Sequence, residues 1–196
     1  MAAERGYKIP VVDLAGETQR QFLVDREPGQ YLGHPTTVLL DDNKTILCVY
    51  PKGHGKGPVV YKRSTDGGKT WSQRLPTPAN WTTSGECPTL FRLTGPDNKK
   101  RLVMFSGLFP VRSAISEDDG RSFTELRAVG NYGGIVPMSS VIRLKTGDHL
   151  AFFHDDGRFY ENSKKVTKFT VYSIRSADGG QTWSNPTVIA AHPKAH

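Results

Sequence analysis

The chain has 196 residues, of which 36% are hydrophobic and 23% are charged, and its formal net charge is +7. This length suits one domain, and the composition is too apolar for a disordered chain. No apolar run approaches the roughly 18 residues that a membrane-spanning helix requires. The lysines and arginines are scattered rather than gathered in one stripe, so neither nucleic acid nor a membrane is expected as a partner.

The start of the chain, MAAERGYKIP, lacks the basic and then apolar layout of a signal peptide. We therefore expect a cytoplasmic protein, or a secreted or periplasmic one from which a leader has been removed. The only cysteines, Cys48 and Cys87, are too few for a disulfide framework or a four-thiolate zinc site. No cofactor and no metal ion is expected.

Short apolar runs alternate with Gly, Asp, Asn and Pro turns along the whole chain, which predicts β-strands and no long helix. Residues 1–30 form an N-terminal segment with one expected strand at 21–25. The remaining strands fall into three groups of four, A to D. In chain order these are 36–40, 45–50, 58–64 and 71–75; then 89–93, 101–105, 112–116 and 122–128; then 139–144, 149–153, 167–176 and 182–189.

One motif, Ser-x-Asp-x-Gly-x-x-aromatic, occurs at the C–D turn of every group, with its serines 52 and 60 residues apart. The Asp can accept backbone N–H groups of its own turn, the Gly can adopt a positive φ, and the aromatic ring can pack beneath the turn. The motif therefore predicts a rigid hairpin rather than a calcium loop, which needs more acidic ligands. Its structural residues are Ser64, Asp66, Gly68, Trp71, Ser116, Asp118, Gly120, Phe123, Ser176, Asp178, Gly180 and Trp183.

Four-stranded units at this spacing are typical of the blades of a β-propeller. The predicted fold is therefore all-β, a single partial propeller domain over 1–196 with blades at about 36–75, 89–128 and 139–189. In an up-and-down blade the A–B and C–D turns lie at one end of the sheet. The B–C and D-to-A loops lie at the other end, which we call the mouth.

The mouth loops are rich in titratable side chains, including five of the six histidines, His192 and His196 among them. An acidic sugar fits such a site, because Arg can clamp a carboxylate and a glycosidic bond needs an acid and a second group for its cleavage. The candidate catalytic residues are Glu86, Asp155 and Asp156. The candidate substrate-binding residues are His34, His54, Arg112, His154 and Arg158.

Each candidate also has an ordinary structural interpretation. A loop histidine can simply be solvated, and Asp155-Asp156-Gly157 can be an ordinary turn. Glu86 can be a surface carboxylate, and Arg112 can pair with Glu117 or Asp118. No base and orienting group accompany Ser84 or Cys87, so a nucleophile is not expected there.

The three motifs resemble the Asp-boxes of the sialidase (neuraminidase) superfamily, in its bacterial sialidase-like branch. The resemblance extends from Tyr7-Lys8-Ile9-Pro10 to the end of the sequence. It implies a six-bladed propeller, of which this chain supplies the N-terminal half, and a glycoside hydrolase of the exo-α-sialidase type acting on the terminal acidic sugar of a glycan. The alternatives are a propeller that binds glycans or proteins without catalysis, and an inert scaffold.

The sequence departs from the sialidase pattern in two places. Lys8 stands where that family has the first arginine of its carboxylate-binding triad, and the first mouth loop, 51–57, contains no acid. The family's other catalytic residues would follow His196, so none of their roles is transferred to this chain. Three blades leave sheet edges open. We therefore expect either a missing C-terminal half or two copies that close a ring with C2 symmetry.

Overall fold

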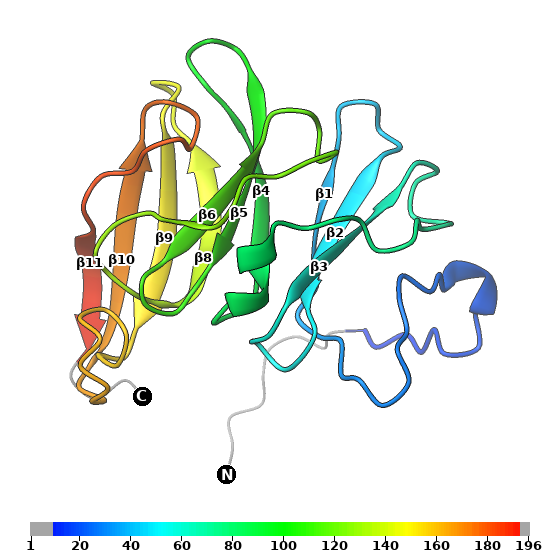
Figure 1. The fold of residues 1–196 in the computed structure, drawn as a ribbon, viewed down its shortest axis with the longest axis horizontal. Helices are drawn as coiled ribbons and strands as arrows, with labels where there is room; N and C mark the ends of the chain where they lie inside the picture. The colour runs from blue at the N-terminus through cyan, green and yellow to red at the C-terminus, as the bar shows by residue number, and fades with distance from the viewer. Residues whose placement is uncertain (1–9, 193–196) are drawn as a thin grey trace.

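The structure is a computed structural model and describes residues 10–192. Its strands form three antiparallel sheets that stand side by side in chain order (Figure 1), and we call them blades 1, 2 and 3. Blade 1 contains β1 (Thr36–Leu39), β2 (Ile46–Pro51) and β3 (Val59–Ser64). Blade 2 contains β4 (Thr89–Thr94), β5 (Lys100–Ser106), β6 (Arg112–Ser116) and β7 (Arg127–Ala128). Blade 3 contains β8 (Ile135–Arg143), β9 (His149–Asp155), β10 (Phe169–Ser176) and β11 (Thr187–His192).

Every strand pairs with its neighbours in the sequence, so each blade is a simple meander. The all-β, propeller-type fold expected from the sequence is confirmed. Helical turns are confined, within the described residues, to two short 3-10 segments, η1 (Thr18–Arg20) and η2 (Ala79–Thr83). Over residues 10–192 no helix has the length and apolar character needed to cross a membrane.

The fourth strands are shorter than the sequence predicts. Residues 71–75 form no strand, and the fourth strand of blade 2 is reduced to Arg127–Ala128. The cause is a hydroxyl side chain just after each motif: Ser72, Thr124 and Ser184 accept the N–H of Arg63, Ile115 and Arg175 at 2.9–3.1 Å. The hydroxyl oxygen thereby accepts an N–H group that a backbone carbonyl would accept in a regular β-ladder. Backbone pairing between the third and fourth strands therefore begins later in the chain or does not form.

The strand expected at residues 21–25 is also absent. This segment is irregular and is held on blade 1 by side chains instead of a ladder. Asp25 accepts hydrogen bonds from Tyr50 at 2.5 Å and from Arg74 at 2.7 Å, and Lys62 donates to the carbonyl of Val24 at 2.7 Å. Residues 21–25 therefore join no sheet.

Two apolar cores fill the spaces between the blades. The first lies between blades 1 and 2 and includes Leu47, Val49, Tyr61, Trp81 and Met104. The second lies between blades 2 and 3 and includes Val103, Phe105, Met138, Phe153 and Ile174. Strand β5 contributes alternate residues to both cores, which explains its uninterrupted apolar sequence, Leu102–Phe105.

The Asp-Gly motifs form the hairpins that the sequence predicts, and we number them hairpins 1 (64–71), 2 (116–123) and 3 (176–183). In hairpin 2, Ser116 donates to Asp118 Oδ1 at 2.7 Å and accepts the N–H of Gly120 at 2.8 Å. Asp118 also accepts the N–H of Ser122 at 2.9 Å. Hairpins 1 and 3 repeat these bonds within 0.1 Å. The three glycines have φ angles of +75° to +89°.

Hairpins 2 and 3 pack against the blade that precedes them. Phe123 contacts Tyr61 and Trp81 of the first core at ring distances of 5.4 and 5.3 Å, and Trp183 contacts Phe105 at 5.5 Å. A Cβ on Gly120 would lie 2.2 Å from Leu47. A glycine is therefore required at this point both for the turn and for the approach of one blade to the next.

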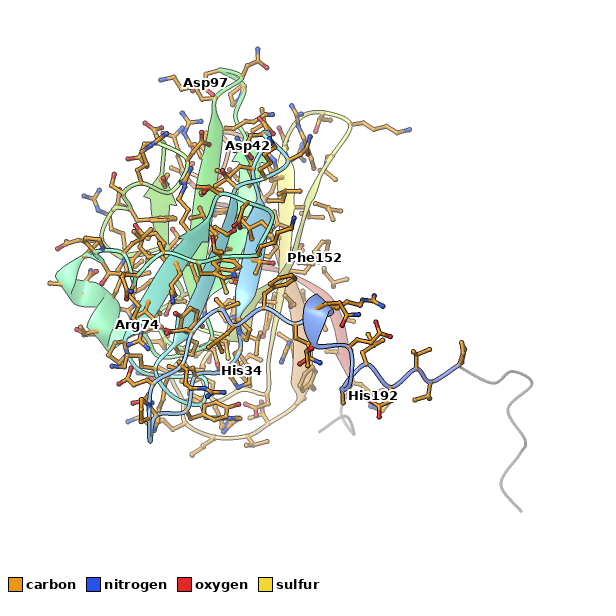
Figure 2. All side chains as sticks on the ribbon, turned by 90° about the vertical axis from the view of Figure 1, so that its right-hand side faces the viewer. His34, Asp42, Arg74, Asp97, Phe152 and His192 are labelled. Atoms are coloured by element: carbon orange, nitrogen blue, oxygen red, sulfur yellow. The ribbon has the colours of Figure 1, made fainter. Side chains whose placement is uncertain are left out.

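The two ends of the blades carry different residues, as the sequence predicts. Asp42 and Asp97, in the A–B turns of blades 1 and 2, lie at one end of the molecule, and His34 and His192 lie at the other (Figure 2). Since the hairpins are at the A–B end, the mouth loops of all three blades meet at the opposite end.

Two glycine substitutions distinguish the cost of the left-handed turn from the cost of disturbing the packing between blades. Gly67 and Gly120 have φ angles of +76° and +75°, but a Cβ on Gly67 meets nothing within 4 Å. Gly67→Ala should cost about 1–2 kcal/mol through the left-handed backbone alone. Gly120→Ala should cost roughly 1–3 kcal/mol more through overpacking against Leu47. Equal losses in urea unfolding would contradict the proposed contact between blades.

Acid should weaken the hairpins. Burial alone would raise the pKa of Asp118, but hydrogen bonds from Ser122, Ser116 and Arg121 outweigh it and lower that pKa to about 2. A lowered pKa stabilises the fold above pH about 4, and this contribution is lost as the pH falls through the folded-state pKa. The stability difference between the wild type and Asp118→Asn should therefore shrink between pH about 4 and about 2. A constant difference in thermal unfolding would contradict this assignment.

Candidate functional site

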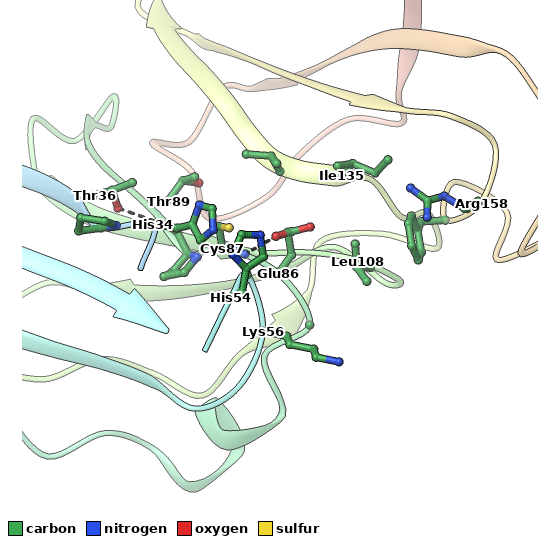
Figure 3. A pocket seen from close by; sticks show the side chains of 16 residues that line it. His34, Thr36, His54, Lys56, Glu86, Cys87, Thr89, Leu108, Ile135 and Arg158 are labelled. Carbon is green, nitrogen blue, oxygen red and sulfur yellow. Dashed lines mark hydrogen bonds between the residues drawn. The ribbon is translucent and has the colours of Figure 1, made fainter. Parts of the chain in front are cut away.

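A pocket of about 610 Å³ opens at the mouth and is lined by all three blades (Figure 3). Blade 1 contributes residues 34–36, which precede and begin β1, and residues 54–56 of its B–C loop. The loop before β4 contributes residues 85–88, and Leu108 follows β5. Blade 3 contributes Ile135 and Val136 of β8 and the loop residues Arg158 and Phe159. Residues more than 100 positions apart in the sequence thus share one wall.

Glu86 supplies the carboxylate of this pocket and is half-buried. Its Oε1 accepts the backbone N–H of Cys87 at 2.8 Å. Gly55 lies directly against it, because a Cβ there would be 2.9 Å from Oε1. In the view of Figure 3 Glu86 lies between the histidine pair on one side and Arg158 on the other.

Two histidines from blade 1 form a pair at the edge of the pocket. The rings of His34 and His54 are 4.6 Å apart and nearly perpendicular, and Tyr31 lies 5.6 Å from His54. Both histidines are exposed, so their nitrogens are accessible to a ligand. His34 and Val136 have φ angles of +52° and +48°. Left-handed backbone of this kind is strained, above all at a β-branched residue, and such strain clusters at functional sites.

Cys87 also lines the pocket but is held as a thiol. Burial, and then the hydrogen bond and charge of Glu86, raise the pKa of Cys87 to about 12. A thiolate is the nucleophilic form of cysteine, so this residue is unsuited to nucleophilic catalysis at neutral pH.

Arg158 is fixed from behind by Asp156. Its Nε donates to both carboxylate oxygens at 3.0 and 2.9 Å, and its Nη2 lies 2.8 Å from Oδ2. Burial would raise the pKa of Asp156, but the hydrogen bonds from Arg158 outweigh it and lower that pKa. The guanidinium also lies 5.0 Å from the centre of the Phe159 ring. Arg158 therefore reaches the pocket as an oriented cation, while Asp156 does not line it.

Asp155 shapes the loop that carries Arg158. It is fully buried, and its Oδ2 accepts the N–H groups of Gly157, Phe159 and Tyr160 at 2.6, 3.2 and 3.1 Å. Its other oxygen, Oδ1, is buried without a hydrogen-bond partner among the described residues. Asp155 is not part of the pocket lining.

Two further candidates face other groups. His154 stacks on Phe169 with a distance of 4.7 Å between the rings. Burial lowers the pKa of His154, although the negative charges of Asp155, Asp156 and Glu86 act to raise it. Arg112 donates to the hydroxyl of Thr83 at 2.8 Å and to the Thr83 carbonyl, and burial lowers its pKa. Glu117, the partner weighed for Arg112, instead pairs with Arg101 at 2.7 Å.

The structure therefore brings together His34, His54, Glu86 and Arg158, and leaves Arg112, His154, Asp155 and Asp156 outside the lining. Sequence reasoning missed Lys56, Cys87, Leu108 and the β8 pair of Ile135 and Val136. Lys56 belongs to the mouth loop 51–57 that the sequence defines. Ile135 and Val136 precede the strand expected at 139–144, whereas β8 begins at Ile135. Lys8 and His196 lie outside the described residues.

In residues 10–192 no cluster of three or more His, Cys, Asp or Glu side chains could hold a metal ion.

Comparison with known proteins supports the assignment of the motif and the fold. Residues 62–73 match the BNR/Asp-box repeat family. No curated protein sequence matches the chain significantly. Residues 62–73, which contain hairpin 1, are thus an Asp-box repeat, as the sequence predicts.

Three solved structures are similar in fold. A GH93 α-L-arabinofuranosidase of Fusarium graminearum, in complex with arabinobiose, has a TM-score of 0.65 and 15% identity over 89% of this chain and 54% of its own. An endo-arabinase from Bacteroides thetaiotaomicron has a TM-score of 0.57 and 15% identity, and the match covers 88% of this chain and 60% of the endo-arabinase. A protein of unknown function from Dyadobacter fermentans has a TM-score of 0.56 and 20% identity, and the match covers 85% of this chain and 53% of that protein. The chain therefore shares the propeller-type fold of these structures and spans about half of their length.

The structural role of Asp155 in its loop can be tested by a conservative substitution. Asp155→Asn keeps the size of the side chain but removes the charge that three N–H groups share, so it should destabilise the protein by roughly 1–3 kcal/mol. Urea unfolding measures this loss, and Glu161→Asn in the same loop, where the side chain is exposed, serves as the control. Unchanged stability in Asp155→Asn would contradict a structural role.

Proposed function

We propose that this protein is a glycoside hydrolase of the exo-α-sialidase type, which binds a terminal acidic sugar in the mouth pocket. The observation that carries the proposal is the composition of the pocket: one carboxylate, Glu86, faces the same space as the cations Lys56 and Arg158 and the pair of histidines. These groups come from loops of different blades, and they suit a ligand that carries both hydroxyl groups and a negative charge.

The cations argue for an acidic sugar rather than a neutral one. The fold neighbours named above include enzymes that act on arabinose, which has no charge. A neutral sugar offers no charged partner to Lys56, and Arg158 would keep only its pairing with Asp156. A sugar carboxylate would accept hydrogen bonds from the guanidinium N–H groups that Asp156 leaves unused, and these charge-assisted bonds are stronger than neutral ones.

Glu86 is the group assigned to proton transfer. Cleavage of a glycosidic bond requires an acid that protonates the leaving oxygen while a second group stabilises or attacks the anomeric carbon. The carboxyl of Glu86 would give its proton to that oxygen, and a water molecule would complete the hydrolysis. His34 and His54 are the other proton carriers within the pocket.

A second candidate is a glycan-binding protein without catalysis. It is favoured by one observation: Glu86 is the only carboxylate among the described lining residues, whereas hydrolysis ordinarily uses a pair. The oxygens of Asp156 and one oxygen of Asp155 are already engaged within their loop. A binding role needs only the cations, the histidines and the apolar wall.

The two candidates differ in their response to Glu86→Gln. If the protein is a hydrolase, it should release the fluorogenic group from an α-linked sialoside, and Glu86→Gln should lower kcat about 10²- to 10⁴-fold. Binding of the free sugar acid, measured by calorimetry, should change little in this variant. Glu161→Gln, a carboxylate outside this pocket, is the matched control and should behave as the wild type.

Other outcomes decide between the candidates. Binding of the sugar acid without release of the fluorogenic group would support the non-catalytic candidate. Release at the wild-type rate by Glu86→Gln would remove Glu86 from the mechanism. Neither binding nor release for acidic sugars, with turnover of an α-L-arabinofuranoside instead, would overturn the acidic-sugar proposal.

A further inference from the structure

The register of the sheets shows that the three blades are equivalent residue by residue. In each blade the serine of the hairpin lies opposite one residue of the second strand: Ser64 opposite Ile46, Ser116 opposite Leu102, and Ser176 opposite His149. Counting from these pairs, Leu47, Val103 and Leu150 are equivalent, and so are Val49, Phe105 and Phe152. In the first strands, Leu40, Leu93 and Leu144 are equivalent.

These equivalent residues receive the next hairpin at both internal junctions. Gly120 of hairpin 2 lies against Leu47, and Gly180 of hairpin 3 lies against Leu93 and Val103, where a Cβ would be 2.7–2.8 Å away. Trp183 then covers Phe105. As a result the receiving residues of blades 1 and 2 are 6% exposed or less. The same contact is therefore built twice within one chain.

Blade 3 presents the same receiving surface without a hairpin on it. Leu144, Leu150 and Phe152 are only half-buried in the described structure, and Ile142 beside them is 45% exposed. Their neighbours Ala151 and Phe153 point to the other side of β9 and are fully buried against blade 2. Blade 3 thus has one covered face and one apolar face that fits an Asp-box hairpin.

Blade 1 presents the complementary part. Hairpin 1 has the same internal hydrogen bonds as the other two, but a Cβ on Gly68 would meet only Ile46 and Trp71 of its own blade, at 3.5 and 3.8 Å. Leu39, on the same face, is 50% exposed. Its equivalent in blade 2, Arg92, reaches the preceding blade at Asp41 with a distance of 3.2 Å. Towards the mouth, Val24, Leu32 and Pro35 lie near Cys48 and Tyr50 of this face, whereas Leu39 towards hairpin 1 stays exposed.

We infer that two copies of this chain associate head to tail, with hairpin 1 and Leu39 of each copy seated on Leu144, Leu150 and Phe152 of the other. The contact between copies repeats the contact that joins blades within the chain, so both surfaces have the required shape. Two such contacts related by a twofold axis close a ring.

The test is the mass of the full chain by light scattering at micromolar concentration. The wild type should have twice the mass of one chain. Leu39→Glu and Phe152→Glu each place a charge in the contact, so each should reduce the mass to that of a single chain. Val188→Glu is the matched control, because Val188 is 58% exposed on the outer strand β11 and outside the contact, and this variant should remain paired.

A mixture of the two disrupted variants distinguishes the head-to-tail contact from contact between like faces. The intact blade 1 of Phe152→Glu can still meet the intact blade 3 of Leu39→Glu, so mixing should restore a paired species. Circular dichroism identifies a variant that has failed to fold. A wild type with the mass of one chain would overturn the inference, and so would loss of pairing in only one of the two variants.

Discussion

The carboxylate at the centre of each hairpin is the interaction on which the arrangement of the blades depends. Asp66, Asp118 and Asp178 each accept a serine hydroxyl and backbone N–H groups of the turn, and thereby hold a glycine in the left-handed conformation. That glycine, in hairpins 2 and 3, allows the turn to touch the preceding blade, and the aromatic ring three residues later fills the junction. Local hydrogen bonding thus sets the spacing between sheets.

The chemistry of the mouth follows from this spacing. Because the hairpins and the A–B turns occupy one end of the blades, loops from all three blades converge at the other end. There His34, His54, Glu86 and Arg158 line one pocket although more than 120 residues separate the first from the last. The apolar junctions supply rigidity, and the loops supply the titratable groups, which is the usual division between scaffold and site.

The sequence was sufficient to predict the hairpins, eleven of the twelve strands expected in the blades, and the end of the molecule that holds the mouth. Turn chemistry and the alternation of apolar residues act locally, so both can be recognised in the sequence. It could not show that Ser72 and Thr124 would displace the ladder and shorten strand D, nor that residues 21–25 would bind Lys62 instead of a strand. The orientation of Asp155, which turns into its own loop, and of Arg112, which turns towards Thr83, depends on neighbours distant in the sequence. Loop residues could therefore be assigned to the mouth but not to the pocket.

We propose that the ligand site lies at the end of the molecule opposite the hairpins. A crystal structure of the full chain with a bound sialic or uronic acid tests it most directly. We expect density for the sugar against Glu86, with its carboxylate towards Arg158 or Lys56 and its ring beside His54. A sugar bound at the hairpin end, or on the outer strands of a blade with the mouth pocket empty, would contradict a ligand site at the mouth.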